Sequence, residues 1–492
     1  MKSALGITLV ALLAACTVGP DYRRPVAETP PTWQTDSYWR VGEPSHAPLA
    51  LDWWQGFGDV ALSGLETQAL GQNQTLAAAS AHYAQARATL AQTSSLALPE
   101  IDLGANASRS RISRNRPVNN YATPNSTTVQ NDLKLAPTVN YDVDLFGRIR
   151  REVEAAHASA DQSRDDLANA RLVLTTDLAS DYFSMRELDA EIDVLNRSVV
   201  LQKKALDYVQ TQHDLGAVSG LDVLQQQAQL DQTRVQAQLL LNQRAQFEHA
   251  IAALVGTPAP QFSIAPELND RPLPPIPLGI PSDVLQRRPD VASAERSMAA
   301  ANAQIGVATA AFYPSVNLLP TGGVDSRSLS TLFDAQSVLW SIGVSATQTI
   351  FDGGRIRANV DFTKAGYEAT VASYRRVVLT AMQEAEDGIT GLASLERAAA
   401  QSQTAVASAR RVLEMSASRY EGGATTFLDV ITAQQALLNI ERQAAQVSGQ
   451  RMLGSVFLVK ALGGDWCGVE ARGAGGARKD CPAPLRQVVG TR

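Results

Sequence analysis

The chain has 492 residues, enough for two to four domains, of which 45% are hydrophobic and 19% charged. This balance is normal for a globular protein and excludes wholesale disorder. The formal net charge of −6 excludes the basic surface that a nucleic-acid-binding protein needs.

The first residues have the pattern of a secretion signal. Lys2 precedes an apolar run, Ala4 to Ala15, that is too short to span a bilayer. The run ends in Leu13-Ala14-Ala15-Cys16, which resembles the lipoprotein cleavage box. We therefore expect residues 1–15 to be a signal peptide and Cys16 to carry an N-acyl diacylglyceryl lipid, with Thr17 implying sorting to the outer membrane. The alternative is an ordinary signal peptide followed by an incidental cysteine.

The two other cysteines, Cys467 and Cys481, lie close together near the C-terminus. An oxidising periplasm would favour a disulfide between them, and two free thiols are the alternative. No other apolar stretch reaches 18 residues, so any membrane crossing must be made by strands.

An internal duplication is the most informative feature of the sequence. Gly147-Arg148-Ile149-Arg150 recurs as Gly354-Arg355-Ile356-Arg357, an offset of 207 (354 − 147). A period this long excludes a short-repeat solenoid, so the chain consists of two copies of one larger unit. The same offset relates Gly216 to Gly423, Ala217 to Ala424, Asp222 to Asp429, Gln227 to Gln434 and Gly256 to Gly463.

Each repeat is predicted to contain a helix, a β-hairpin, a very long helix and a return helix. The hairpins are expected at about 100–146 and 314–351. The predicted organisation is a signal peptide (1–15), an extended segment (16–58), repeat 1 (59–256), an equatorial linker (257–282), repeat 2 (283–463) and a C-terminal tail (464–492).

The predicted strands alternate between apolar and polar residues. Ile101 and Leu103 alternate with Asp102 and Gly104, and a similar pattern continues in residues 132–145 and 337–345. Period-two alternation over about ten residues suits a membrane barrel with lipid on one side and water on the other. A half-buried sheet in a soluble protein gives the same pattern.

The predicted long helices favour the first interpretation. Residues 148–215 contain neither Pro nor Gly and hold one heptad register, which as one helix would be roughly 100 Å long. No compact globular domain contains such an element. Four strands per chain cannot close a barrel, and an open edge in lipid leaves backbone groups unsatisfied, so at least two chains are required.

Several motifs together resemble the TolC-like outer-membrane factors, specifically the outer-membrane lipoproteins of RND efflux systems (the NodT and OprM type). The resemblance covers nearly the whole chain after the signal peptide. Its most specific segments include Cys16 to Tyr22, Trp53-Trp54 with Phe57-Gly58-Asp59, Asp144 to Arg148, Arg287 to Asp290, Phe312-Tyr313-Pro314, Phe351 to Arg355 and Ala461 to Trp466.

The resemblance implies a mixed α and β membrane protein. Its members form a homotrimer with a twelve-stranded outer-membrane β-barrel, four strands from each chain, continuous with a twelve-helix periplasmic α-barrel. Such a channel docks a periplasmic adaptor, or membrane fusion protein, and an inner-membrane RND-type pump. It passively conducts drugs or other small molecules to the exterior.

The resemblance also implies roles for residues at the helix–turn–helix tips. Gly216, Gly220, Gly422 and Gly423 would face the adaptor. Asp429 matches a pore-lining carboxylate, whose three copies would favour cations. Tyr420 and Asp222 match a pair that holds the closed state. For Asp429, a plain helix-start role is the alternative. The second pore carboxylate and an arginine latch of the family are replaced by Thr432 and Thr425.

Nothing in the sequence supports an enzyme or a bound cofactor. The five histidines are scattered, and no metal-binding spacing, phosphate loop or nucleophile elbow is present. Two alternatives remain open: the same channel type serving type I protein secretion, and a periplasmic coiled-coil scaffold lipoprotein.

Overall fold

A computed structural model of the chain describes residues 17–24, 52–111, 113–115, 129–268, 273 and 288–464. The expected signal peptide, Cys16, Cys467 and Cys481 lie outside these residues. The chain divides into two compact units. We call them the strand unit (residues 1–25, 82–163 and 293–374) and the hairpin unit (residues 26–81, 164–292 and 375–492). Each unit is therefore built from parts of both repeats.

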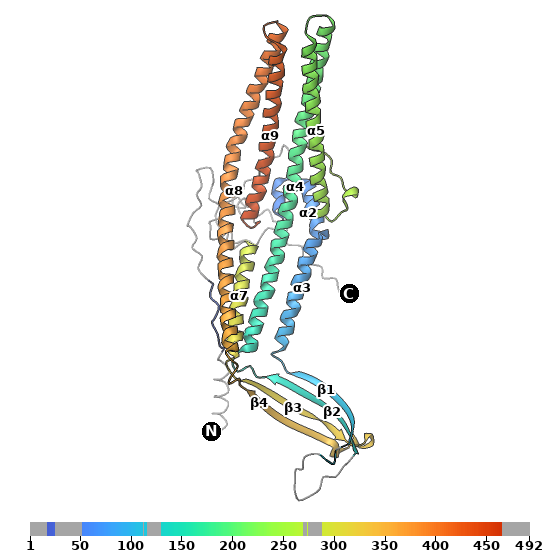
Figure 1. Cartoon of the computed structure of the whole chain (residues 1–492), viewed down its shortest axis with the longest axis vertical. Helices are drawn as coiled ribbons and strands as arrows, with labels where there is room; N and C mark the ends of the chain where they lie inside the picture. The colour runs from blue at the N-terminus through green and yellow to red at the C-terminus, as the bar shows by residue number, and fades with distance from the viewer. Residues whose placement is uncertain are drawn as a thin grey trace, which may run out of the picture. The chain divides into compact units, whose positions relative to one another are not determined.

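The strand unit contains one antiparallel sheet. Its strands are β1 (Glu100–Arg111), β2 (Val129–Asp142), β3 (Ser315–Ser326) and β4 (Val338–Thr347), in the order β1-β2-β3-β4 (Figure 1). Each repeat supplies one hairpin, and the pairing of β2 with β3 joins the two. Strands β1 and β4 lie at the two edges, so each has one side that is unpaired within the chain.

The two faces of the sheet differ in polarity because alternate residues of a strand point to opposite faces. One cross-strand row is apolar throughout and another is polar, as the pairing registers show. Large apolar side chains are exposed on the first face, including Ile101 (71% exposed), Trp340 (75%) and Ile342 (76%). The apolar row is Ala105, Leu135, Val324 and Val338, and the polar row is Asn106, Lys134 and Asp325.

Most of helix α3 (Gln74–Ser95), most of helix α7 (Pro289–Ala310) and the first parts of α4 (Arg148–Asp214) and α8 (Arg355–Glu421) complete the strand unit. A carboxylate caps each long helix at its start. Asp144 accepts hydrogen bonds from the backbone N–H of Ile149 (2.9 Å), and Asp352 accepts one from that of Ile356 (2.8 Å). Capping satisfies backbone donors that have no partner inside the helix.

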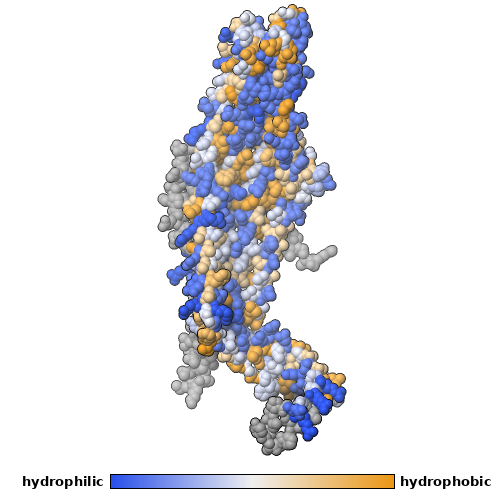
Figure 2. All heavy atoms as spheres, in the orientation of Figure 1, coloured by the Kyte–Doolittle hydropathy of each residue, from blue (hydrophilic) through white to orange (hydrophobic). Residues whose placement is uncertain are grey.

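The two long helices have the same length and equivalent ends. Both α4 and α8 contain 67 residues, and their first residues are separated by the repeat offset (355 − 148 = 207). The return helices α5 (Gly220–Leu254) and α9 (Phe427–Ala461) contain 35 residues each, with the same offset (427 − 220 = 207). Small hydrophobic and hydrophilic areas alternate on the visible surface of these helices (Figure 2).

The core of the hairpin unit forms where η1 (Trp53–Phe57) and α2 (Val60–Gln72) pack against the long helices. The Trp53 indole N–H donates to Thr175 Oγ1 (3.2 Å). Asp59 caps α2 with one oxygen and accepts the Tyr182 hydroxyl with the other (2.9 Å). The Trp-Trp and Phe-Gly-Asp motifs therefore position α2 on α4.

The described start of the linker is held by buried charges. Arg244 donates to the Ile264 carbonyl oxygen (2.6 Å), and Arg186 donates to that of Ala265 (2.8 Å). Asp189 lies between the two arginines and accepts a hydrogen bond from each. Because these groups are paired and hydrogen-bonded, their burial is compensated. None of the helices in the described part of the chain combines the length and the apolar character needed to cross a membrane.

Candidate functional site

Helices α4 and α8 end in the same kind of turn. Gly216 and Gly423 have φ angles of +74° and +71°, a region that glycine adopts without the strain imposed by a Cβ. In each turn two backbone N–H groups donate back into the last turn of the helix, which is the Schellman arrangement. Each bond joins a backbone N–H to a backbone carbonyl oxygen: Gly216 to His213 (2.8 Å), Ala217 to Gln212 (2.8 Å), Gly423 to Tyr420 (2.9 Å) and Ala424 to Arg419 (2.8 Å).

The other two predicted tip glycines have ordinary backbone angles. A Cβ on Gly220 would lie 3.6 Å from His213 Cε1, and one on Gly422 would lie 3.5 Å from the Ser418 carbonyl oxygen. Both distances are ordinary van der Waals contacts. Of the four glycines, only Gly216 and Gly423 are required by the backbone.

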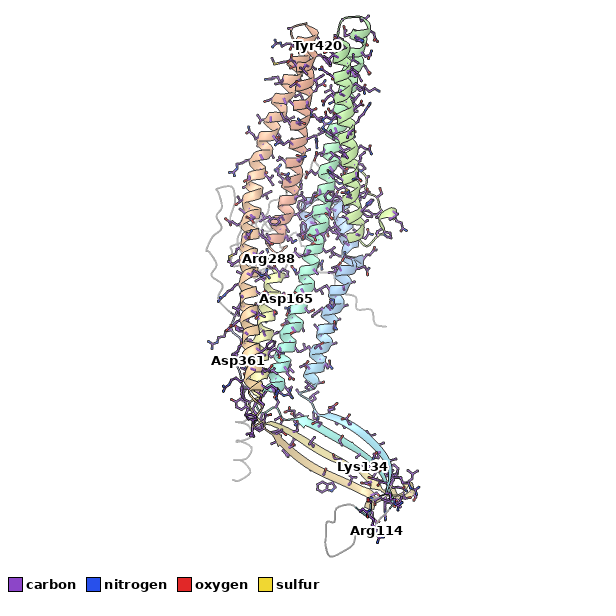
Figure 3. The ribbon with its side chains drawn as sticks, in the orientation of Figure 1. Arg114, Lys134, Asp165, Arg288, Asp361 and Tyr420 are labelled. Carbon is purple, nitrogen blue, oxygen red and sulfur yellow. The ribbon has the colours of Figure 1, made fainter. Side chains whose placement is uncertain are left out.

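A small apolar cluster, which we call the tip cluster, joins the two hairpins within the chain. Its buried members are Val209 of α4 and Phe427 and Val430 of α9. Tyr420 of α8 lies near the end of the hairpins (Figure 3). Its ring packs against the cluster, with its centroid 5.1 Å from that of Phe427. Val223 of α5 also contacts the cluster, so all four hairpin helices contribute.

Asp429 is an exposed carboxylate at the third position of α9. Its Oδ2 accepts hydrogen bonds from the Thr426 backbone N–H (3.1 Å), the Thr426 hydroxyl (2.9 Å) and the Thr425 hydroxyl. The bonds from Thr425 and Thr426 lower the pKa of Asp429 below its ordinary value. Within one chain Asp429 therefore caps a helix. The pore-lining role concerns the assembled protein and stays a prediction.

Tyr420 and Asp222 come close to each other across the two hairpins. Burial and the nearby Asp222 carboxylate raise the pKa of the Tyr420 hydroxyl. The described side chains form no hydrogen bond between this hydroxyl and Asp222, and the bond expected in a closed pore stays a prediction. The Thr425 hydroxyl, at the position where the family resemblance predicts a latch arginine, donates to Asp429.

The segment that follows Cys16 is docked in the strand unit. Arg151 donates to Asp21 (2.8 Å) and to the Val18 carbonyl oxygen (3.3 Å), and Asn302 donates to that of Pro20 (2.9 Å). Gly19 lies so close to Gly306 that an added Cβ would be 2.5 Å from the Gly306 Cα. The Thr-Val-Gly-Pro-Asp-Tyr part of the motif, residues 17–22, therefore has a structural role.

Sequence reasoning missed several buried polar residues in the helices. Gln202, Gln226 and Gln434 occupy core positions, and Glu66 lies in the core of the hairpin unit with both carboxylate oxygens unpartnered. Burial raises the pKa of Glu66 to about 9. For Gln202 the sequence pattern could have indicated a core position, since the residues seven positions before and after it, Leu195 and Val209, are apolar. Among the described residues, no group of His, Cys, Asp or Glu side chains could hold a metal ion.

A family model described as outer membrane efflux protein matches residues 65–257 and 280–464. The pyoverdine export outer membrane protein OpmQ of Pseudomonas aeruginosa is 30% identical over 485 residues, covering 98% of this chain and all of OpmQ. The toluene efflux pump outer membrane protein TtgF of Pseudomonas putida is 29% identical over 474 residues, covering 95% of this chain and 98% of TtgF.

Among solved structures, the outer-membrane channel OprN superposes with a TM-score of 0.84 at 28% identity. The match covers 92% of this chain and all of OprN. The family and the outer-membrane location predicted from the motifs are confirmed. The chain therefore belongs to the outer membrane efflux protein family, whose members are outer-membrane channels and not enzymes.

Proposed function

We propose that three copies of this chain assemble into one efflux channel, with a closed barrel in the outer membrane and a helical tunnel below it. The observation that carries the proposal is the sheet of four strands whose two edges, β1 and β4, are unpaired within the chain. Unpaired backbone groups cannot remain in lipid, so each edge requires a strand from another copy. Three copies supply twelve strands (3 × 4).

The polarity of the sheet supports the same assembly. A closed barrel needs an apolar outer face toward lipid and a polar inner face toward the channel. The exposed Ile101, Trp340 and Ile342 suit the lipid-facing side, and the row with Lys134 and Asp325 suits the water-filled side.

The tips of the hairpins are proposed to meet a periplasmic adaptor and, through it, an inner-membrane pump. Leucines are exposed there beside the two glycine turns, namely Leu215 (74% exposed), Leu221 (61%) and Leu428 (54%). Exposed apolar side chains grouped at one end of a protein are typical of a surface that binds another protein. Asp429, together with Tyr420 and Asp222, would control the aperture at this end.

A lipid on Cys16 is proposed to anchor the assembly in addition to the barrel. Thr17 packs against Gly147 at the start of α4, and the Val18 N–H donates to the Phe146 carbonyl oxygen (3.2 Å). Thr17, the residue that follows Cys16 in the sequence, is therefore held at the point where β2 leads into α4. Replacing Cys16 with Ser should leave an unacylated precursor, and normal palmitate labelling of that variant would contradict the anchor.

The cargo is proposed to be small molecules. The relatives described above are named for pyoverdine export and for toluene efflux, which supports this class over protein secretion.

The mass of the detergent-extracted particle, from light scattering corrected for detergent, tests the assembly. We expect three times the mass of the mature chain. The same particles in planar bilayers should conduct ions. A monomer that stays soluble after delipidation would contradict the channel and support the scaffold lipoprotein.

A further inference from the structure

Three glutamines form a buried polar layer in the hairpin unit. Gln202 of α4 and Gln226 of α5 are 0% exposed, and Gln434 of α9 is 5% exposed. In each of them the side-chain oxygen Oε1 is buried and has no hydrogen-bond partner. We call these residues the glutamine layer. A buried amide oxygen without a donor is unfavourable, and such groups in native proteins require an explanation.

Contacts between helices place the three residues at one level of the hairpin unit. The Gln226 side-chain amide donates to the Gln202 backbone oxygen (2.9 Å), which joins α5 to α4. One turn after Gln226 in α5, the side chain of Gln229 is hydrogen-bonded to that of Gln435, which is the residue next to Gln434 in α9. Gln434 therefore lies level with the two glutamines of the first hairpin.

The glutamine layer separates two apolar clusters. On α4, Leu195 belongs to a cluster with Leu188, Val194, Leu240 and Leu438, and Val209 belongs to the tip cluster. Gln202 lies midway between them in the same heptad register (202 − 195 = 7 and 209 − 202 = 7). On α9, Gln434 likewise lies four residues from Val430 of the tip cluster and four from Leu438 of the other. The apolar seam is thus interrupted at one level on both hairpins.

The second repeat places small side chains at this level. Ala409 and Ala433 are the equivalents of Gln202 and Gln226 (202 + 207 and 226 + 207), and both are buried. A layer of this composition contributes little apolar packing between the hairpins. The tip cluster beyond it is held mainly by its own contacts, such as that of Tyr420 with Phe427.

We propose that the glutamine layer is the hinge at which the tip cluster and its turns move apart from the rest of the hairpin unit. When the tips separate, water reaches the three amide oxygens and supplies the hydrogen bonds that they lack in the packed state. Opening at this level therefore loses little packing and gains solvation, whereas opening at an apolar layer would lose packing without that gain. The inference rests on the proposed function, in which the tips control the aperture.

The test replaces the three glutamines with methionine, which has a similar length and shape and no amide. Amide hydrogen exchange in the assembled channel would be followed in two segments, residues 203–225 and 410–433. We expect the Gln202→Met/Gln226→Met/Gln434→Met variant to slow exchange there roughly tenfold, because opening would no longer solvate a buried amide. Exchange in residues 164–195 should stay unchanged.

Thr233→Val is the matched control. Thr233 is a buried polar residue of the same α5 seam, but its hydroxyl donates to the Gln229 carbonyl oxygen (3.0 Å). This variant should leave exchange at the tips as in the unmodified protein. Equal slowing by Thr233→Val, or unchanged or faster exchange in the methionine variant, would overturn the hinge.

Two further measurements separate this inference from the proposed function. The methionine variant should have a higher unfolding temperature, and a lower one would overturn the idea that the amides are unsatisfied. In planar bilayers it should be open for a smaller fraction of time than the unmodified channel. An unmodified protein that conducts no ions would contradict the channel itself, while the exchange comparison would still decide the hinge.

Discussion

The two hairpin tips share a backbone but not their side chains. Both turns have a glycine at positive φ and the same pair of backbone hydrogen bonds. At equivalent positions, however, His213 is replaced by Tyr420 and Gly220 by Phe427 (each 207 residues apart). The aromatic pair that builds the tip cluster is thus supplied by the second hairpin alone. Duplication preserved the residues that fix the turn, and divergence changed the residues that hold the hairpins together.

The carboxylates at the starts of the two return helices show the same divergence. Asp222 and Asp429 are equivalent and both stand in the first turn of a return helix. Asp429 is bound by Thr425 and Thr426, whereas Asp222 lies near Tyr420. One duplicated position therefore holds a local cap in one hairpin, and in the other it holds a carboxylate that raises the pKa of a tyrosine hydroxyl on the opposite hairpin.

The largest effect at the tips is expected from Phe427→Ala. Phe427 is 4% exposed and has only Gly220 as its counterpart, so its removal would empty the tip cluster. Loss of a buried Phe costs about 3 kcal/mol, and hydrogen exchange at both tips should accelerate accordingly. The adjacent Leu428 is 54% exposed, so Leu428→Ala should change exchange little. Equal effects of the two variants would show that the cluster does not join the hairpins.

Gly216→Ala and Gly423→Ala test whether the two turns are equivalent. Each places a Cβ at positive φ and should destabilise its turn by about 1 kcal/mol, measured by thermal unfolding or local exchange. Gly422→Ala, at an ordinary φ, should have almost no effect. A clearly larger loss for one of the two turns would show that their surroundings, rather than the shared backbone, set the cost.

Asp429→Asn and Asp222→Asn separate the two roles of the duplicated carboxylate. The pKa of Asp429 is lower in the folded chain than in the unfolded chain, so its stabilising effect is present above the unfolded pKa and is lost as pH falls through the folded pKa. The protection of backbone amides at the start of α9, corrected for the pH dependence of the intrinsic exchange rate, should therefore fall in acid, and Asp429→Asn should remove this dependence. Asp222→Asn should leave it intact. If Asp429→Asn kept the same acid sensitivity at the start of α9, another titratable group would have to cause that sensitivity.

The same Asp429→Asn variant addresses the pore in planar bilayers. Three carboxylates around one aperture would attract cations, so their removal should reduce cation selectivity or raise single-channel conductance. If neither quantity changes, Asp429 acts only as the helix cap that is observed within one chain.

The smallest effect on stability is expected from Tyr420→Phe. The ring keeps its packing on Phe427, and only the hydroxyl near Asp222 is removed. Thermal stability should stay nearly constant while the open fraction in planar bilayers rises, if the hydroxyl binds Asp222 in the closed channel. An open fraction equal to that of the unmodified protein would eliminate this bond as a latch.

Periodicity and glycine positions in the sequence determined the elements of the fold. The long helices follow from the heptad register between Gly147 and Gly216, since burial of one helical stripe requires that spacing. The strands follow from alternation, and the turns follow from glycines whose φ other residues adopt at a cost. The family motifs were equally local, and the comparisons with known proteins confirmed the family that they indicate.

Tertiary structure decided which of these elements meet. The pairing of β2 with β3 unites the two repeats in one sheet, and each compact unit contains parts of both. The alternation of apolar and polar residues does not by itself determine which strands pair. The level shared by Gln202, Gln226 and Gln434 likewise depends on packing between segments that are far apart in sequence. A local sequence pattern specifies the backbone conformation of a residue and the face of the helix or strand on which it lies. The partners of that residue are determined by how the faces of different elements pack together.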